Sequence, residues 1–170
     1  MLLALTISLA GCRAKAPAED PALQTRKQLE QELASAYPMK APSASGVRSF
    51  DLTAAPASVQ HFDGRLLDVW AYNGRVPGPV LRVRLGESIA VKLHNRLPQP
   101  TTIHWHGVRV PNAMDGVPGV TQDPIPPGGV FTYRFTPKDP GTFWFHPHVR
   151  GAEQVERGLF GVLIVDDGKP

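Results

Sequence analysis

The chain has 170 residues, of which 42% are hydrophobic and 19% charged, as expected for one globular domain with a tail. Its formal net charge is +3, but the Lys and Arg residues are scattered and form no basic run or helical stripe, so we expect no nucleic-acid partner. The 18 Pro and 16 Gly residues indicate many turns and little long helix, which favours an all-β fold.

The first twelve residues, MLLALTISLAGC, form an apolar run that ends in the only cysteine, Cys12, so no disulfide can form within the chain. The run is shorter than the about 20 apolar residues of a membrane-spanning helix. It is similar to a bacterial lipoprotein signal peptide, although no Lys or Arg precedes it. This similarity implies cleavage before Cys12, lipidation of its thiol, export, and anchoring in the outer membrane facing the periplasm. The alternative is an apolar N-terminus with an unreactive cysteine.

Residues 13–46 are rich in Ala, Pro, Ser, Gln and charged residues, and they show no strand alternation. This composition predicts a tether that leads to a domain at residues 47–170. Within the tether, Asp20 and Pro21 are a helix start signal, and spaced leucines follow up to Pro38. We therefore expect at most one short, weakly anchored helix before the domain.

From Val47 onward, runs of β-branched and aromatic residues alternate with turn signals such as Asn73-Gly74 and Pro140-Gly141. The alternation of apolar and polar residues in VLRVRL is typical of antiparallel strands with one solvated face. Eight short strands of this kind predict a two-sheet β-sandwich. The predicted strands are residues 48–54, 65–71, 80–84, 88–94, 101–106, 130–135, 141–146 and 159–165.

Four of the six histidines form two His-x-His pairs, His104 with His106 and His146 with His148. Because successive side chains of a strand point to opposite faces, the members of each pair share a face. Pro147 has no N–H for a ladder, so His148 is expected where its strand leaves the sheet. If the two strands are neighbours, four imidazoles meet at one end of the sandwich.

Four neutral nitrogen donors without a carboxylate or thiolate suit copper, zinc or nickel rather than magnesium or calcium. The alternative for each pair is a set of surface or hydrogen-bonded histidines without a metal. The remaining histidines, His61 and His94, lie outside the pattern and are interpreted as surface or turn residues.

The stretch TTIHWHGVRVPNAMDGVPGVTQDPIPPGG, followed by GTFWFHPH and GLFGVLIV, resembles the first cupredoxin domain of the laccase-like multicopper oxidases. The upstream AYNGRVPGPVLRVRLGESIAVKLHNRL is similar to that family's opening strands, so the resemblance covers about residues 66–166. One departure is Asp123, where many relatives carry Cys or a small residue. The resemblance implies a cupredoxin-like Greek-key β-sandwich that binds copper.

The resemblance also implies a role for each histidine of the two pairs. His104 matches a ligand of the type 2 copper, whereas His106, His146 and His148 match ligands of the type 3 copper pair. These ions form the cluster at which the family reduces O2 to water while a donor is oxidised. Asp115 matches an acid that helps to deliver protons to bound oxygen, and the other interpretation, a turn residue before Gly116, stays open.

In the family, the type 1 copper and the other four cluster histidines lie in the last cupredoxin domain, in a His-Cys-His motif and its neighbours. This chain has no such motif, so it remains open whether the chain by itself is an enzyme. We expect the remaining cupredoxin domains as partners, in a longer chain or a second one. The alternatives are a free-standing periplasmic lipoprotein that binds or buffers copper and an interaction domain with relic histidines.

Overall fold

The computed structural model describes residues 21–36 and 45–167, and the chain divides into two units, residues 1–38 and 39–170. In the first unit, helix α1 (Pro21–Ala36) is the short helix that the sequence predicts, and Leu29 on it is 54% exposed. The predicted signal peptide and the lipidation at Cys12 lie outside the described residues. Within the described ranges, no helix is both long and apolar enough to cross a membrane.

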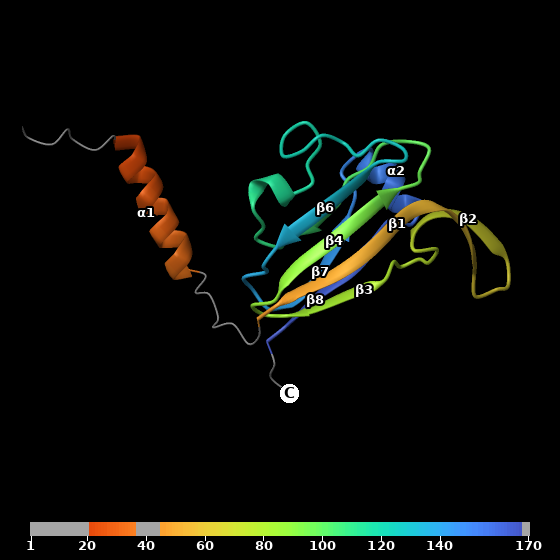
Figure 1. Ribbon diagram of the computed structural model, residues 1–170, viewed down its shortest axis with the longest axis horizontal. Helices are drawn as coiled ribbons and strands as arrows, with labels where there is room; N and C mark the ends of the chain where they lie inside the picture. Colours follow the sequence, from red (N-terminus) through yellow and green to blue (C-terminus); the bar gives the residue numbers. More distant parts are fainter. Residues whose placement is uncertain (1–20, 37–44, 168–170) are drawn as a thin grey trace, which may run out of the picture. The chain divides into compact units, whose positions relative to one another are not determined.

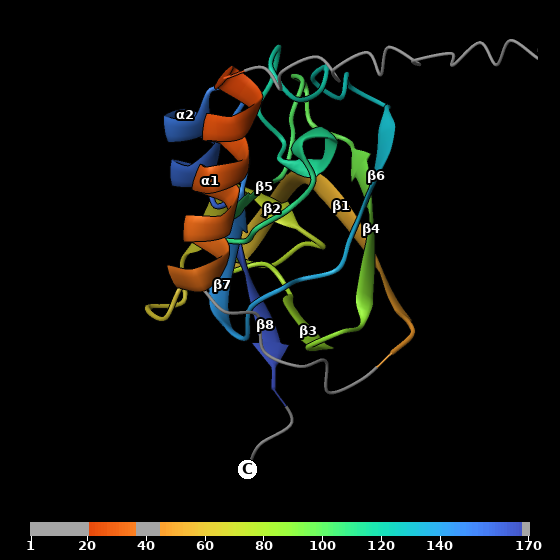
Figure 2. The same ribbon diagram turned by 90° about the vertical axis from the view of Figure 1, so that its left-hand side faces the viewer.

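Over its described residues, 45–167, the second unit has eight strands in two four-stranded sheets, which face each other across the core (Figures 1 and 2). The first sheet has the strand order β2-β1-β4-β6 and the second has the order β3-β8-β7-β5. The strands are β1 (Val47–Gln60), β2 (Leu66–Tyr72), β3 (Val80–Arg84), β4 (Ser88–Asn95), β5 (His104–His106), β6 (Val130–Phe135), β7 (Gly141–His146) and β8 (Gly161–Asp166).

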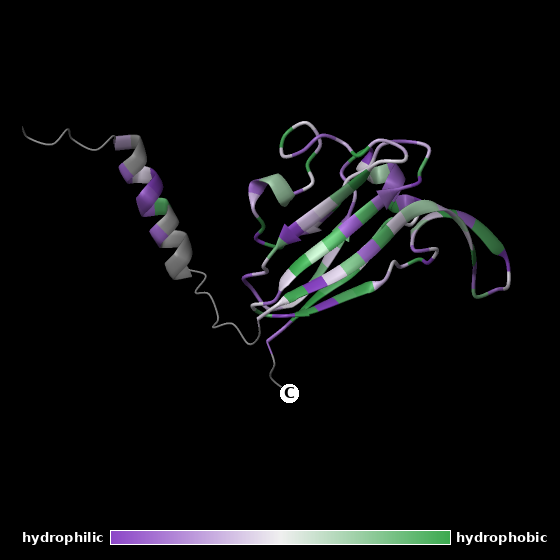
Figure 3. Cartoon of the chain, viewed as in Figure 1, coloured by the Kyte–Doolittle hydropathy of each residue, from purple (hydrophilic) through white to green (hydrophobic). Residues whose placement is uncertain are grey.

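Alternation of side chains along each strand builds the core between the sheets. In β4, Ile89, Val91 and Leu93 are buried while Lys92 between them is exposed, and Figure 3 shows this alternation in colour. Large aromatic side chains fill the centre, because the strands of both sheets point their bulkiest residues inward. The largest fully buried side chains are those of Trp105, Tyr72, Tyr133 and Phe145.

The order in which the strands join the sheets is that of a Greek-key sandwich. After the β1–β2 hairpin, the chain enters the second sheet with β3, returns with β4, crosses again to β5, returns with β6 and ends with β7 and β8. As a result, β1 pairs in parallel with β4, and β3 pairs in parallel with β8. The predicted all-β sandwich is confirmed.

Three strands differ from the prediction by more than one residue at one end. The first strand continues through Pro56 to Gln60, where it forms a long hairpin with β2. The strand predicted at residues 101–106 contains only His104–His106, because Thr101 makes an isolated bridge to Ile125 and the Ile103 N–H donates to the Tyr133 hydroxyl. The last strand begins at Gly161, since the preceding residues close a helix.

That helix, α2 (Gly151–Glu156), and the short 3-10 helix η1 (Asn112–Met114) are not predicted by the sequence pattern. Neither segment has the apolar spacing of an amphipathic helix. Helix α2 ends where the Leu159 N–H donates to the Gln154 carbonyl, and β8 follows. It therefore occupies the connection between β7 and β8, directly after the second histidine pair.

Candidate metal centre

The two histidine pairs lie side by side because β5 and β7 are neighbours in the second sheet. In the antiparallel register, His104 is opposite His146 and His106 is opposite Trp144. These side chains point away from the core, whereas Trp105 between the first two histidines is fully buried. The alternation of the strands therefore brings three imidazoles onto the outer face of one sheet.

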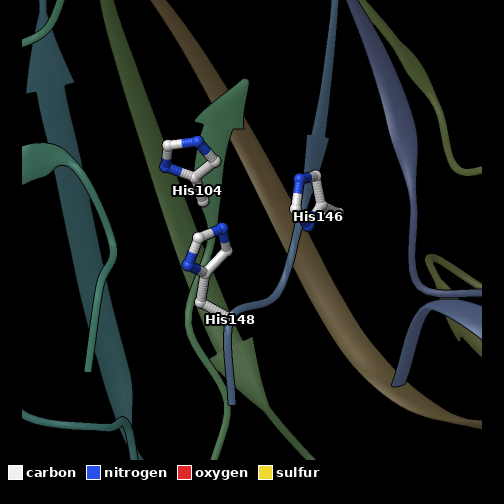
Figure 4. Close-up of side chains that lie close together, drawn as sticks. All are labelled: His104, His146 and His148. Atoms are coloured by element: carbon white, nitrogen blue, oxygen red, sulfur yellow. The ribbon is translucent and has the colours of Figure 1, made fainter. Parts of the chain in front are cut away.

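The fourth imidazole comes from the segment that follows β7. The strand ends at His146, Pro147 turns the chain, and the His148 N–H donates to the Thr102 hydroxyl at 3.3 Å. This contact brings His148 back over β5, where its ring centroid lies 4.3 Å from that of His104. Figure 4 shows the rings of His104, His146 and His148 gathered from the two strands and the following turn.

The spacing of the ring nitrogens fits metal ions. One nitrogen each of His104, His146 and His148 lie within 4.8 Å of one another, and His106 Nδ1 lies 3.4 Å from His146 Nε2. Two nitrogens that bind one ion at about 2.0 Å in tetrahedral geometry are about 3.3 Å apart, and they can never be more than about 4 Å apart. The His106–His146 pair therefore has the spacing for one shared ion.

Hydrogen bonds to carbonyl groups set which nitrogen of two rings faces the cluster. His104 Nδ1 lies 2.8 Å from the carbonyl oxygen of Asp115, and His146 Nδ1 lies 3.1 Å from that of Pro147. Because a carbonyl oxygen only accepts, Nδ1 of each ring carries the proton, and Nε2 keeps its lone pair for a metal. In His106 the nitrogen that faces His146 is Nδ1. This ring therefore offers Nδ1 to a metal, whereas His104 and His146 offer Nε2.

The histidines of the second pair have lowered pKa values. Partial burial lowers the pKa of His146 and of His148 below its ordinary value of 6.5, and repulsion from the neighbouring histidines lowers the pKa of both further. Both rings are therefore neutral at neutral pH. A neutral ring is the form that binds a metal ion.

Asp115 belongs to a turn and also contacts His104. Its backbone (φ −76, ψ −20) closes the 3-10 helix η1, and Gly116 after it has a φ of +79, so Asp115 lies where the chain bends. The Asp115 carboxylate oxygen Oδ1 lies 3.3 Å from His104 Nδ1. Asp115 thus orients His104 through its carbonyl and places a carboxylate beside the cluster, while its role in proton delivery stays a prediction.

An apolar strip extends across the sheet from the histidines. His106, Trp144, Val162 and Val80 are register neighbours on β5, β7, β8 and β3, and the Trp144 ring stacks on His146 with centroids 3.9 Å apart. Trp144 is 38% exposed and Val80 is 52% exposed. An open hollow beside the strip is lined by Trp144, His146, Pro147, His148, Gly151, Ala152 and Val155.

The other two histidines lie apart from this cluster. His61 follows β1 and pairs with Asp63 at 2.9 Å, and His94 points out of β4 toward Asp51 at 3.6 Å. Sequence reasoning missed the polar residues that hold the site, Thr101, Thr102 and Gln154 among them. No motif marks them, because their contacts join segments about 50 residues apart.

The comparisons with known proteins agree on one protein family. A family model described as multicopper oxidase matches residues 55–170. The copper resistance protein A homolog of Pseudomonas syringae pv. tomato is 41% identical over 121 residues, which are 71% of this chain and 20% of that protein. The multicopper oxidase MmcO of Mycobacterium tuberculosis is 38% identical over 165 residues, which are 97% of this chain and 31% of that protein.

The solved structures agree with the curated proteins. The crystal structure of a multi-copper oxidase from Pseudomonas thermotolerans has a TM-score of 0.71 and 44% sequence identity, over 75% of this chain and 31% of that one. The chain thus spans between a fifth and a third of the length of these relatives.

Proposed function

The chain belongs to the multicopper oxidase family, and from this premise we propose that it supplies four histidine ligands to a cluster of copper ions. The observation that carries the proposal is the convergence of two His-x-His pairs from neighbouring strands, with His106 Nδ1 and His146 Nε2 at the spacing of ligands to one ion. Four imidazoles without a thiolate suit copper, which heads the divalent affinity order.

The resemblance to the family assigns each histidine a ligand role, and the nitrogens that face the cluster are compatible with these roles. His106 through Nδ1 and His146 through Nε2 would hold one copper of the type 3 pair, and His148 would be a ligand of the other. His104 would hold the type 2 copper through Nε2, since its Nδ1–H donates a hydrogen bond to the Asp115 carbonyl. Bound copper supplies the one-electron chemistry by which the family's cluster reduces O2 to water.

The side chains around the cluster support this role. Trp144 stacks on His146 and covers one side of the ring, which limits the access of water to the ligand nitrogens. The Asp115 carboxylate lies beside His104 at the edge of the cluster, the position that the family resemblance gives to an acid that helps to deliver protons to oxygen. Proton delivery by Asp115 is part of the proposal.

The apolar strip supports a proposal for the side on which a partner domain would bind. The histidines lie on an open face of the sheet next to Trp144, Val162 and Val80, so ligands from another domain can approach them without rearrangement of the core. Exposed apolar surface beside polar residues is typical of protein interfaces. We propose that the cupredoxin domain with the type 1 copper and the other cluster histidines binds there, in the same chain or a second one.

Copper titration of the purified 170-residue chain tests the proposal. We expect saturable binding that the His61→Ala/His94→Ala double variant retains. His106→Ala and His146→Ala should each remove the same ion. The His106→Ala/His146→Ala double variant should therefore bind as many ions as either single variant. The bound copper should lack the intense blue absorption of a copper-thiolate site, and oxygen uptake with a phenolic donor should begin only when a chain with the His-Cys-His domain is added.

The outcomes separate the alternatives. A lack of copper binding would refute the metal centre, and oxygen uptake by this chain alone would refute the incomplete cluster. Copper binding without oxygen uptake after addition of the partner domain would favour the alternative of a free-standing copper-binding lipoprotein. Export and lipid anchoring at Cys12 stay predictions from the sequence.

A further inference from the structure

Gln154 is the only residue of helix α2 that is fully buried. A glutamine in such a position needs partners for its amide, because an unpaired buried polar group is costly. Its Nε2 donates to the Pro100 carbonyl at 2.9 Å, and its Oε1 accepts from the Thr101 hydroxyl at 2.8 Å. Both ends of the amide are therefore bonded to a segment more than 50 residues away in the chain.

The two segments that Gln154 joins are those that carry the histidine pairs. Pro100 and Thr101 lead directly into β5, which begins at His104. Helix α2 begins at Gly151, three residues after His148. The same two segments meet once more, where the His148 N–H donates to the hydroxyl of Thr102.

We propose that Gln154 is a positioning residue that sets the distance between His148 and His104, an inference that rests on the proposed copper function. His148 lies beyond the end of β7 and belongs to no strand, so the β5–β7 ladder does not hold it. Its ring reaches His104, 4.3 Å between centroids, only if the turn after β7 stays against residues 100–102. The Gln154 amide holds the helix after that turn to the same residues.

Other polar contacts of α2 do not replace this one. Glu153 pairs with Arg150 and Arg157, which are exposed neighbours within or beside the helix. Its carboxylate also accepts a hydrogen bond from the Gln99 side chain, so α2 has another contact with the segment before β5, but Glu153 is partly exposed whereas Gln154 is fully buried. Exposed ion pairs of this kind contribute little to stability. A glutamine suits the position because its amide donates to a carbonyl and accepts from a hydroxyl at once. A glutamate would lose the donor, and a leucine would lose both groups.

The test compares three variants of the full chain with a control. Gln154→Leu removes both hydrogen bonds, Gln154→Glu removes the donor, and Thr101→Val removes only the hydroxyl with little change in volume. The control, Val83→Ala, shortens a buried side chain on β3, where it pairs with Val165 at the other end of the sheet from His146. Thermal unfolding of all four proteins shows how much each substitution destabilises the fold.

Two measurements then separate positioning from general stability. In the metal-free chain, the amide hydrogen of His148 should exchange faster in the Gln154 and Thr101 variants than in Val83→Ala at equal loss of stability. Copper affinity, measured by competition with a chelator, should fall about 10- to 100-fold in Gln154→Leu, as for other residues that hold metal ligands in place. Thr101→Val should show a smaller loss in the same direction.

The positioning role would be overturned if Thr101→Val and Val83→Ala showed equal exchange at His148 and equal copper affinity. This comparison can still be made if Gln154→Leu does not fold. A wild-type chain that binds no copper would instead refute the proposed function. Because exchange at His148 is measured without metal, the two failures can be told apart.

Discussion

The orientation of His104 depends on two residues that do not bind metal. The Asp115 carbonyl accepts a hydrogen bond from His104 Nδ1–H and so turns Nε2 toward the cluster. Gly116 lets the loop pass close beneath β5, because a Cβ at this position would lie 1.8 Å from the Ile103 carbonyl oxygen. The ligand is therefore positioned by a close backbone approach that only glycine allows.

Gly116→Ala is expected to destabilise the domain more than a positive φ alone would. The φ of +79 costs an alanine about 1–2 kcal/mol, and the clash with Ile103 adds about 1–3 kcal/mol. Gly119→Ala is the matched control, since Gly119 has a φ of +73 but no atom within 4 Å of a new Cβ. Urea unfolding followed by tryptophan fluorescence measures both, and equal losses of unfolding free energy would contradict the close approach.

At the scale of elements, β5 is short because the polar groups of the residues before it form hydrogen bonds that involve side chains instead of bonds to a neighbouring strand. Thr101 bonds to Gln154, Thr102 accepts from His148, and the Ile103 N–H donates to the hydroxyl of Tyr133 at 2.7 Å. Tyr133 belongs to β6 of the opposite sheet, so its hydroxyl joins the two layers directly before His104. A predicted six-residue strand thus becomes a junction between both sheets and α2.

Tyr133→Phe is expected to lower the free energy of unfolding by about 1–3 kcal/mol, because the buried Ile103 N–H then has no acceptor. Tyr72→Phe is the control. The Tyr72 side chain is equally buried, but its hydroxyl makes no hydrogen bond within the described part of the chain, so its removal should be neutral or stabilising. Chemical denaturation of both variants measures the difference, and a Tyr72→Phe variant as unstable as Tyr133→Phe would refute this role of the hydroxyl.

At the scale of the whole molecule, the histidine cluster makes the stability of the metal-free domain depend on pH. The pKa values of His146 and His148 in the folded chain are lower than 6.5. As the pH falls, the unfolded chain therefore binds more protons at these residues than the folded chain does. Their contribution to stability is present above about pH 6.5 and is lost as the pH falls through the folded pKa values. Bound copper should strengthen this dependence, because the ion keeps the folded rings unprotonated while the unfolded chain still takes up protons.

Thermal unfolding between pH 8 and pH 5 measures this dependence. The metal-free chain should lose stability below about pH 6.5, and His148→Gln should lose less over the same range, since one of the two titrating rings is absent. A pH profile that is the same in the wild type and in His148→Gln would contradict the argument.

The class of fold and the histidines of the cluster follow from local patterns in the sequence. Alternation with a period of two and frequent turn signals are local properties, so they indicate strands without knowledge of their partners. The spacing of His104 with His106 and of His146 with His148 is equally local, and Pro147 marks where the second strand ends. For these reasons the eight strands and the four imidazoles were predictable.

Only the tertiary structure decided how those histidines are held. The pairing of β5 with β7 selects which nitrogens face each other, and the close approach at Gly116 brings the Asp115 carbonyl to His104. The buried Gln154 lies in a helix with no apolar periodicity, and its partners are more than 50 residues away. Such contacts depend on which segments the folded chain brings together, and no local pattern in the sequence records that.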